Sequence, residues 1–120
     1  MIGTLHGIVI DCAEPDSLAA FYQELLGMKR VQDEGEWIVI GDAPDRPGIA
    51  FAKVPSYRPP TWPEGVRPQY RHFDVRVHDL DVAAAAALKL GATLLQDGET
   101  SRVFADPAGH PFCLVRLPPA

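Results

Sequence analysis

The sequence predicts an α+β protein built from two βαβββ units. One observation is a repeat: a β-branched apolar run, an acidic turn, a helical run and a glycine occupy residues 4–27 and again residues 71–91. The two copies lie about 64 or 65 residues apart, roughly half the chain. A second observation is that short apolar runs separated by turn residues follow each copy. A repeat of this size indicates two half-domains that share one sheet and one pocket.

The first strand and helix have clear boundaries. Residues 4–12 are apolar and β-branched enough for a strand. A helix follows, in which Asp16 or Ser17 is expected to accept hydrogen bonds from the first free N–H groups. Gly27 is expected to end it in a left-handed conformation. Its apolar side chains recur at helical spacing and form one stripe, consisting of Leu18, Phe21, Tyr22, Leu25 and Leu26.

Three short strands complete the first half. Residues 28–31 and 36–40 are predicted to flank a turn at Asp33, Glu34 and Gly35. Residues 49–54 form the next strand after a loop that contains two prolines. The first half is therefore a βαβββ unit.

A proline-rich segment separates the halves. The stretch 55–68 holds five of the twelve prolines, a density that disfavours regular structure. We therefore predict one domain, 1–120, made of half-units 1–54 and 70–120 joined by linker 55–69. The linker carries Tyr57 and Trp62, and two roles stay open for it. It covers a pocket or a partner surface, or it is a stiff connection whose Trp62 packs on its own domain.

The second half repeats the order of the first. Residues 71–77 are predicted to form a strand, and residues 82–90, with five consecutive alanines, a helix that approaches the sheet closely. Asp106 to Gly109 has the residues of a tight turn, and His110 behind it is expected to make a local hydrogen bond. The remaining strands are predicted at residues 92–95, 102–105 and 112–117.

Composition and charge indicate which partners the protein can bind and in which compartment it is found. The formal net charge is −5, whereas a nucleic-acid-binding protein needs a concentrated basic face. The sequence contains no apolar run of the length of a membrane span and no pattern of a signal peptide. Two cysteines are too few for a disulfide framework and indicate reduced thiols. We expect a cytoplasmic protein that binds neither nucleic acid nor membrane.

The ordered set of motifs resembles a known superfamily. Phe21-Tyr22 precedes Leu25-Leu26-Gly27, His72 stands at the head of the fifth strand, and Asp106-Pro107-Ala108-Gly109-His110-Pro111-Phe112 precedes the last. Together they resemble the vicinal oxygen chelate superfamily, in its glyoxalase-like, bleomycin resistance protein and dioxygenase branch. The resemblance implies a cupped, incomplete eight-stranded mixed sheet with helices outside, a pocket within, and a functional homodimer.

The resemblance also implies positions for metal ligands. Catalytic members take them from the first, fifth and eighth strands, and sometimes the fourth. Two chelating oxygens of a substrate need an open-sided metal held by histidine and carboxylate. His72 matches the fifth-strand position, whereas Gly7, Ala52 and Cys113 stand at the first, fourth and eighth. We therefore expect a degenerate metal site.

The register of the first strand decides whether His6 belongs to this site. The apolar set of that strand begins at Ile8 and that of the fifth strand at Phe73, which pairs Gly7 with His72. His6 then points away from the cup. A slip of one residue would reverse every side chain and bring His6 into the cup, so this alternative stays open.

Alternation in the fifth strand places His72, Asp74 and Arg76 on the cup face. Asp74 is expected to pair with Arg76 or with a cation of a neighbouring strand, because a buried unpaired charge is costly. The alternative is a metal cluster of His72, Asp74 and Asp11. Cys113 is expected to be a small apolar residue of the pocket wall, although a thiolate can also bind zinc.

The favoured hypothesis is a small-molecule-binding protein without a cofactor, whose cup holds a small, partly apolar ligand. His72, Asp74, Arg76 and Cys113 would contact that ligand. Pockets combine apolar walls with a few placed polar groups. The aromatic walls would be Trp37, Tyr57 and Trp62.

The alternative is a metal-dependent enzyme, either a glyoxalase-type lyase or isomerase or an extradiol-type dioxygenase. It would use zinc, nickel, manganese or iron at a rebuilt site centred on His72, joined by His6 or Asp11. A third possibility is a subunit for assembly or regulation. The sequence contains no nucleophile elbow, phosphate-binding glycine loop or Cys-x-x-Cys pair.

Overall fold

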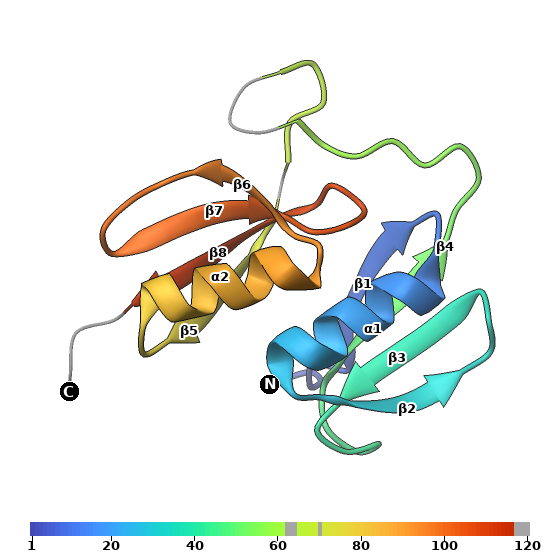
Figure 1. Ribbon diagram of the computed structural model, residues 1–120. Coiled ribbons are helices and arrows are strands. Elements are labelled where there is room, and N and C mark those ends of the chain that lie inside the picture. The colour runs from blue at the N-terminus through green and yellow to red at the C-terminus, as the bar shows by residue number, and fades with distance from the viewer. Residues whose placement is uncertain (62–64, 70, 117–120) are drawn as a thin grey trace. The chain divides into compact units, whose positions relative to one another are not determined.

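The computed structural model of the protein describes residues 1–61, 65–69 and 71–116 (Figure 1). The chain divides into two compact units, Met1–Tyr57 and Arg58–Ala120. The division falls inside the predicted linker 55–69. Within the described residues, no helix has the length and apolar character needed to cross a membrane.

The N-terminal unit is a four-stranded mixed sheet with one helix. Its strands lie in the order β1-β4-β3-β2, with β1 parallel to β4 and the other neighbours antiparallel. The first strand is shorter than the predicted range 4–12, since it begins at Gly7 and residues 4–6 lie outside it. The elements are β1 (Gly7–Cys12), α1 (Pro15–Leu26), β2 (Lys29–Asp33), β3 (Trp37–Gly41) and β4 (Gly48–Lys53).

The C-terminal unit has the same topology. Its sheet has the order β5-β8-β7-β6, again with the first pair parallel and the others antiparallel. The predicted α+β architecture of two βαβββ units is therefore confirmed. The elements are β5 (Phe73–Val77), α2 (Leu80–Leu90), β6 (Thr93–Gln96), β7 (Ser101–Ala105) and β8 (Pro111–Arg116).

The start of α1 differs from the prediction. Glu14 is the N-cap residue, without a capping side-chain hydrogen bond, and Pro15 occupies the first turn. Proline is favoured there because it has no N–H to satisfy and its φ is already helical. The Ser17 hydroxyl donates to the carbonyl oxygen of Glu14 instead of capping N–H groups. The end of the helix is as predicted, with Gly27 in the left-handed conformation at φ 68°.

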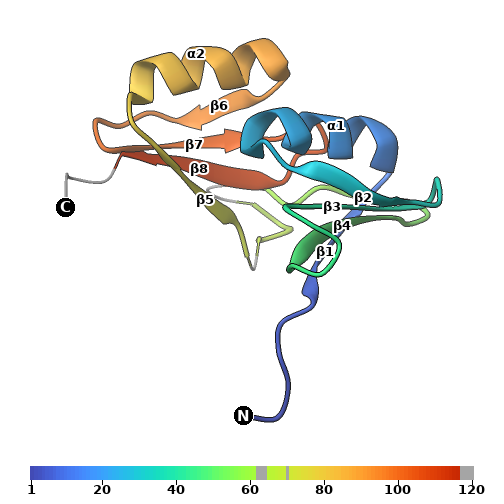
Figure 2. The same cartoon turned by 90° about the horizontal axis from the view of Figure 1, so that it is seen from below.

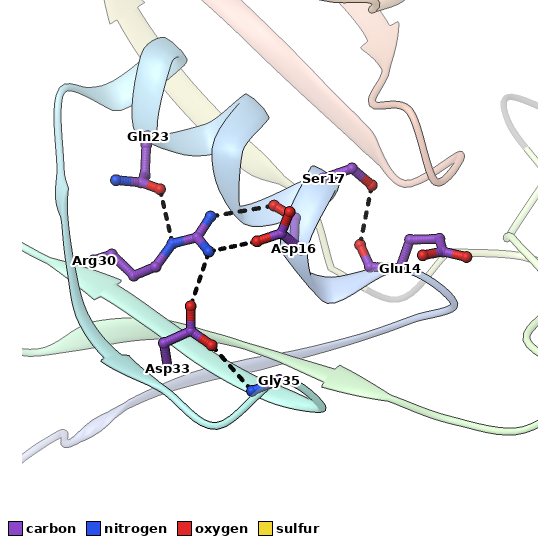
Figure 3. Close-up of polar contacts among 7 residues, drawn as sticks. All are labelled: Glu14, Asp16, Ser17, Gln23, Arg30, Asp33 and Gly35. Atoms are coloured by element: carbon purple, nitrogen blue, oxygen red, sulfur yellow. Dashed lines mark hydrogen bonds and ion pairs between the residues drawn. The ribbon is translucent and has the colours of Figure 1, made fainter.

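Asp16 has a different role from the expected cap, because it binds Arg30 of β2 (Figure 3). The Arg30 guanidinium donates to Asp16 at 2.7 Å, to Asp33 at 3.1 Å and to Gln23 at 3.0 Å. Asp33 also accepts the Gly35 backbone N–H at 3.0 Å. That hydrogen bond, followed by the one from Arg30, lowers the pKa of Asp33. The network joins the helix, the strand and its turn.

The second helix has conventional ends. Asp79 caps it by accepting the Val82 N–H at 3.1 Å, so the helix begins at Leu80, two residues before the predicted start. Gly91 ends it at φ 115°. Arg102 of β7 donates to Asp81 in the first turn at 2.6 Å. Each helix is thus tied to its own sheet by an arginine.

One face of each sheet packs under its helix and carries the core of the unit. Tyr22 of α1 stacks on Phe51 of β4, and Phe104 stacks on Phe112, both with ring centroids 5.6 Å apart. In the C-terminal unit α2 lies along one side of the sheet and contacts β8 (Figure 2). Because Ile10 is the register partner of Phe51, the odd-numbered side chains of β1 lie on the opposite face. This confirms the predicted register, with Gly7 and not Ile8 on that face.

Candidate functional site

The candidate site lies on the open face of the C-terminal sheet, defined here as the face opposite α2. Phe73 of β5 is the register partner of the buried Phe112 of β8, so both lie on the helix side. The next pair, Asp74 and Cys113, therefore lies on the open face. His72, two residues before Asp74, is on the same side. Strand pairing fixes the positions of Asp74 and Cys113, and the contact of His72 with Asp74 places His72 beside them.

The side chains of His72, Asp74 and Cys113 form a cluster. The His72 Nε2 atom is 3.2 Å from the Asp74 Oδ1 atom. One nitrogen, one oxygen and one sulfur atom of the three residues lie within 4.8 Å of one another. The side chains of His72 and Asp74 are 34% and 65% exposed, and Cys113 is half-buried. Solvent and small solutes can therefore reach the cluster.

Asp74 has a different partner from the expected one. It pairs with His72, its neighbour on the same strand face, and not with Arg76. Arg76 is the register partner of Val115, one step further along the open face, and is exposed. The sheet thus presents a cation close to the cluster, while Asp74 itself pairs with His72.

Cys113 is more than the apolar wall residue that the sequence predicted. Burial raises the pKa of its thiol, and the negative charge of Asp74 and a hydrogen bond with it raise that pKa further. The thiol is accordingly protonated at neutral pH. A protonated thiol is a poor nucleophile, which disfavours covalent catalysis by Cys113 alone.

The first-strand ligand position is closed by the backbone. A Cβ atom added at Gly7 would lie 2.6 Å from the carbonyl oxygen of Gly48, its partner on β4. Real Cβ atoms do not approach a backbone oxygen so closely, so a larger residue would force the two strands apart. The fourth-strand position holds Ala52, opposite Trp37 and Asp11. Neither Gly7 nor Ala52 offers a metal donor.

The other predicted residues belong to the N-terminal unit or lie outside the described part of the chain. Trp37 and Asp11 are on the open face of the N-terminal sheet, and Trp37 is 36% exposed. Tyr57 ends that unit and is half-buried. His6 precedes β1 and is exposed. Trp62 lies outside the described residues.

The turn before β8 is held by Asp106. Its buried carboxylate accepts the backbone N–H groups of Ala108 and His110 at 2.8 Å and 3.0 Å, and lies 2.9 Å from His110 Nδ1. The predicted local hydrogen bond of His110 is confirmed. The central role of Asp106 was missed, although the Asp-Pro-x-Gly-His spacing already favours such a turn. The turn sets the start of β8 and so the position of Cys113.

The residues present do not fit the octahedral metal that the superfamily resemblance implies. That metal needs histidine and carboxylate donors from both halves of the chain. Here the first- and fourth-strand positions hold Gly7 and Ala52, and the eighth holds a thiol. The N-terminal positions offer no side-chain donor, and Gly7 has no room for one. We therefore derive no reaction step through such a metal.

Comparison with known proteins agrees with this fold. The two βαβββ units have the architecture expected from the resemblance to the vicinal oxygen chelate superfamily. The chain belongs to the glyoxalase-like domain family, whose sequence model matches residues 7–115. No curated protein sequence matches significantly.

Solved structures share the fold at low sequence identity. A glyoxalase/bleomycin resistance protein/dioxygenase family enzyme from Burkholderia phytofirmans has a TM-score of 0.76 at 16% identity, covering 97% of this chain and 100% of the other. A glyoxalase/dioxygenase from Nostoc punctiforme has a TM-score of 0.73 at 18% identity, covering 97% and 92%. The fosfomycin resistance protein FosX from Listeria monocytogenes has a TM-score of 0.72 at 16% identity, covering 98% and 96%. At these identities the likeness establishes the fold alone.

Proposed function

We propose that this protein binds a small, partly apolar molecule on the open face of the C-terminal sheet without the octahedral metal of its superfamily. The observation that carries the proposal is the close approach of Gly7 to Gly48. It leaves no space for a metal-ligating side chain on the first strand. With Gly7 at the first-strand position and Ala52 at the fourth, the chain lacks the N-terminal donors that the octahedral metal of the superfamily needs.

The chemistry of the open face supports a ligand of mixed character. Val115 follows Cys113 on the same face of β8 as half-buried apolar surface, and the buried Val103 is the register partner of Cys113 on β7. The cluster of His72, Asp74 and Cys113 adds hydrogen-bonding groups, and Arg76 adds a positive charge. Apolar walls with a few placed polar groups are typical of small-molecule sites. Trp37, Tyr57 and Trp62 are part of the proposal as aromatic walls.

Ligand-observed NMR with a panel of small aromatic and aliphatic compounds, both neutral and carboxylated, tests this proposal. We expect carboxylated compounds to bind the wild type and to lose affinity in Arg76→Ala. Arg116→Ala is the matched control, because Arg116 ends the same sheet with the opposite side-chain direction. Equal losses in both variants, or binding by no member of the panel at millimolar concentration, would contradict the proposal.

A second candidate is a metal-dependent lyase, isomerase or dioxygenase with a rebuilt site. The close approach of His72, Asp74 and Cys113 favours it, because these donors lie together before any metal binds. Glyoxalase and ring-cleavage assays with zinc, nickel, manganese and iron test this candidate. Activity that depends on metal and disappears in His72→Ala would establish it and displace the metal-free proposal.

Two further features belong to the same proposal. We propose that residues 1–120 act as a single glyoxalase-like domain, and that the protein is a cytoplasmic homodimer. Light scattering coupled to size-exclusion chromatography tests the oligomeric state, and a monomer at micromolar concentration would contradict the dimer.

A further inference from the structure

We infer that His72, Asp74 and Cys113 bind a thiophilic cation of the zinc class, held by the C-terminal unit alone. This site would differ from the octahedral metal site that the superfamily resemblance implies, because that site takes donors from both halves of the chain. The site rests on the same cluster as the second candidate function, but it requires neither catalysis nor the proposed small molecule.

The backbone brings the three donors together. Asp74 and Cys113 are register partners on adjacent parallel strands, and His72 lies two residues before Asp74 on the same face. Their ligand atoms already lie within 4.8 Å of one another. Parallel pairing of β5 and β8 brings the oxygen donor of Asp74 beside the sulfur donor of Cys113, and His72, just before β5, adds a nitrogen donor. No residue of the N-terminal unit takes part.

The donor set determines which cation fits. Thiolate and imidazole ligands select zinc and related soft cations, whereas magnesium and manganese prefer sets of oxygen ligands. The cluster contains a single carboxylate and a single histidine, too few for either an all-oxygen site or a two-histidine iron site. The sulfur of Cys113 is therefore the donor that decides selectivity.

The distances allow a tetrahedral arrangement after a small closure. Zinc bonds of about 2.0 Å to nitrogen and about 2.3 Å to sulfur place neighbouring ligand atoms about 3.5 Å apart. The Asp74 side chain, which is 65% exposed, can rotate to close that gap. Binding replaces the S–H bond of Cys113 with an S–metal bond and releases its proton to solvent. The fourth position stays open to water or a small ligand.

Titration of the metal-free full-length protein with zinc, cobalt(II) and manganese(II) tests this inference. We expect one equivalent of zinc to bind far more tightly than manganese, and cobalt to give a sulfur-to-cobalt charge-transfer absorption. Cys113→Ser should abolish that absorption and weaken zinc binding by at least about 100-fold, since even indirect partners of a metal cost 10–100-fold. Cys12→Ala is the matched control, because Cys12 is fully buried in the N-terminal unit.

A second measurement does not depend on the folding of Cys113→Ser. In the Cys12→Ala protein, stoichiometric zinc should slow alkylation of Cys113, whereas magnesium should not. Three results would overturn the inference: manganese binding as tight as zinc binding, cobalt binding without a sulfur absorption, or alkylation of Cys113 at the same rate with and without zinc.

Discussion

Gly7 of β1 faces Gly48 of β4 so closely that a Cβ atom at Gly7 would lie 2.6 Å from the Gly48 carbonyl oxygen. The two glycines let the parallel strands approach at the position where superfamily enzymes are expected to carry a first-strand ligand. The close packing of these two strands therefore leaves no space for a metal-ligating side chain at position 7. A single substitution there cannot restore the metal ligand.

Gly7→His is the direct test of this packing argument. We expect it to lower the free energy of unfolding by about 1–3 kcal/mol, as overpacking usually does, and to add no metal affinity. Urea denaturation and metal titration measure the two effects. Gly3→His is the matched control, because no atom lies within 4 Å of a Cβ at Gly3. A stable Gly7→His protein that binds manganese or nickel would refute the argument.

The raised pKa of Cys113 predicts a pH dependence of stability. Deprotonation in the unfolded chain begins near the ordinary value of 9.0, whereas the folded state keeps its proton to higher pH. The thiol therefore contributes stability below pH 9.0, and this contribution is lost as the pH rises through the folded pKa. Relative to Cys113→Ser, the wild type should lose stability in denaturation series run from pH 8 upward. A constant difference across that range would contradict the assignment.

Asp74→Asn tests one cause of the same shift. Removal of the carboxylate charge beside the thiol should lower the pKa of Cys113, although burial would keep it above its ordinary value. Thiolate absorbance against pH in the Cys12→Ala background measures this. An unchanged or higher pKa would show that Asp74 does not act on the thiol.

Arg30 joins α1 to β2 and to the turn after β2. Its removal should therefore lower the stability of the N-terminal unit. Arg30→Ala removes hydrogen bonds to Asp16, Asp33 and Gln23, and we expect it to destabilise the protein by about 1 kcal/mol, since the partners are largely exposed. Thermal denaturation at low and high salt measures the effect, which should shrink with salt. Arg46→Ala, an exposed arginine of the β3–β4 loop, is the control and should change little.

The aspartate turn before β8 should contribute more to stability than the hydrogen bonds of Arg30 do. Asp106→Ala leaves two backbone N–H groups and the His110 ring without their buried acceptor, a loss of about 2–3 kcal/mol. Chemical denaturation measures it, with Asp45→Ala in an exposed loop as the control. A loss no larger in Asp106→Ala than in Asp45→Ala would contradict this role of the turn.

Much of the fold follows from local sequence, because periodicity and glycine positions are local signals. The matching apolar runs at Ile8 and Phe73 predicted the register that places Gly7 and His72 at equivalent positions. The predicted cap of α1 was wrong because Asp16 pairs with Arg30 of β2. Such a contact between separate elements cannot be predicted from local sequence. The proximity of Asp74 to Cys113 and of Gly7 to Gly48 depends on which strands pair, which periodicity within one strand does not reveal.

Elemental analysis of purified, untagged protein, followed by calorimetric titration with iron(II), manganese, nickel and zinc, tests the central claim most directly. The account predicts no stoichiometric iron, manganese or nickel, and any tight binding confined to zinc and abolished in Cys113→Ser. One equivalent of iron, manganese or nickel that survives dialysis in the wild type and is lost in His72→Ala would contradict it.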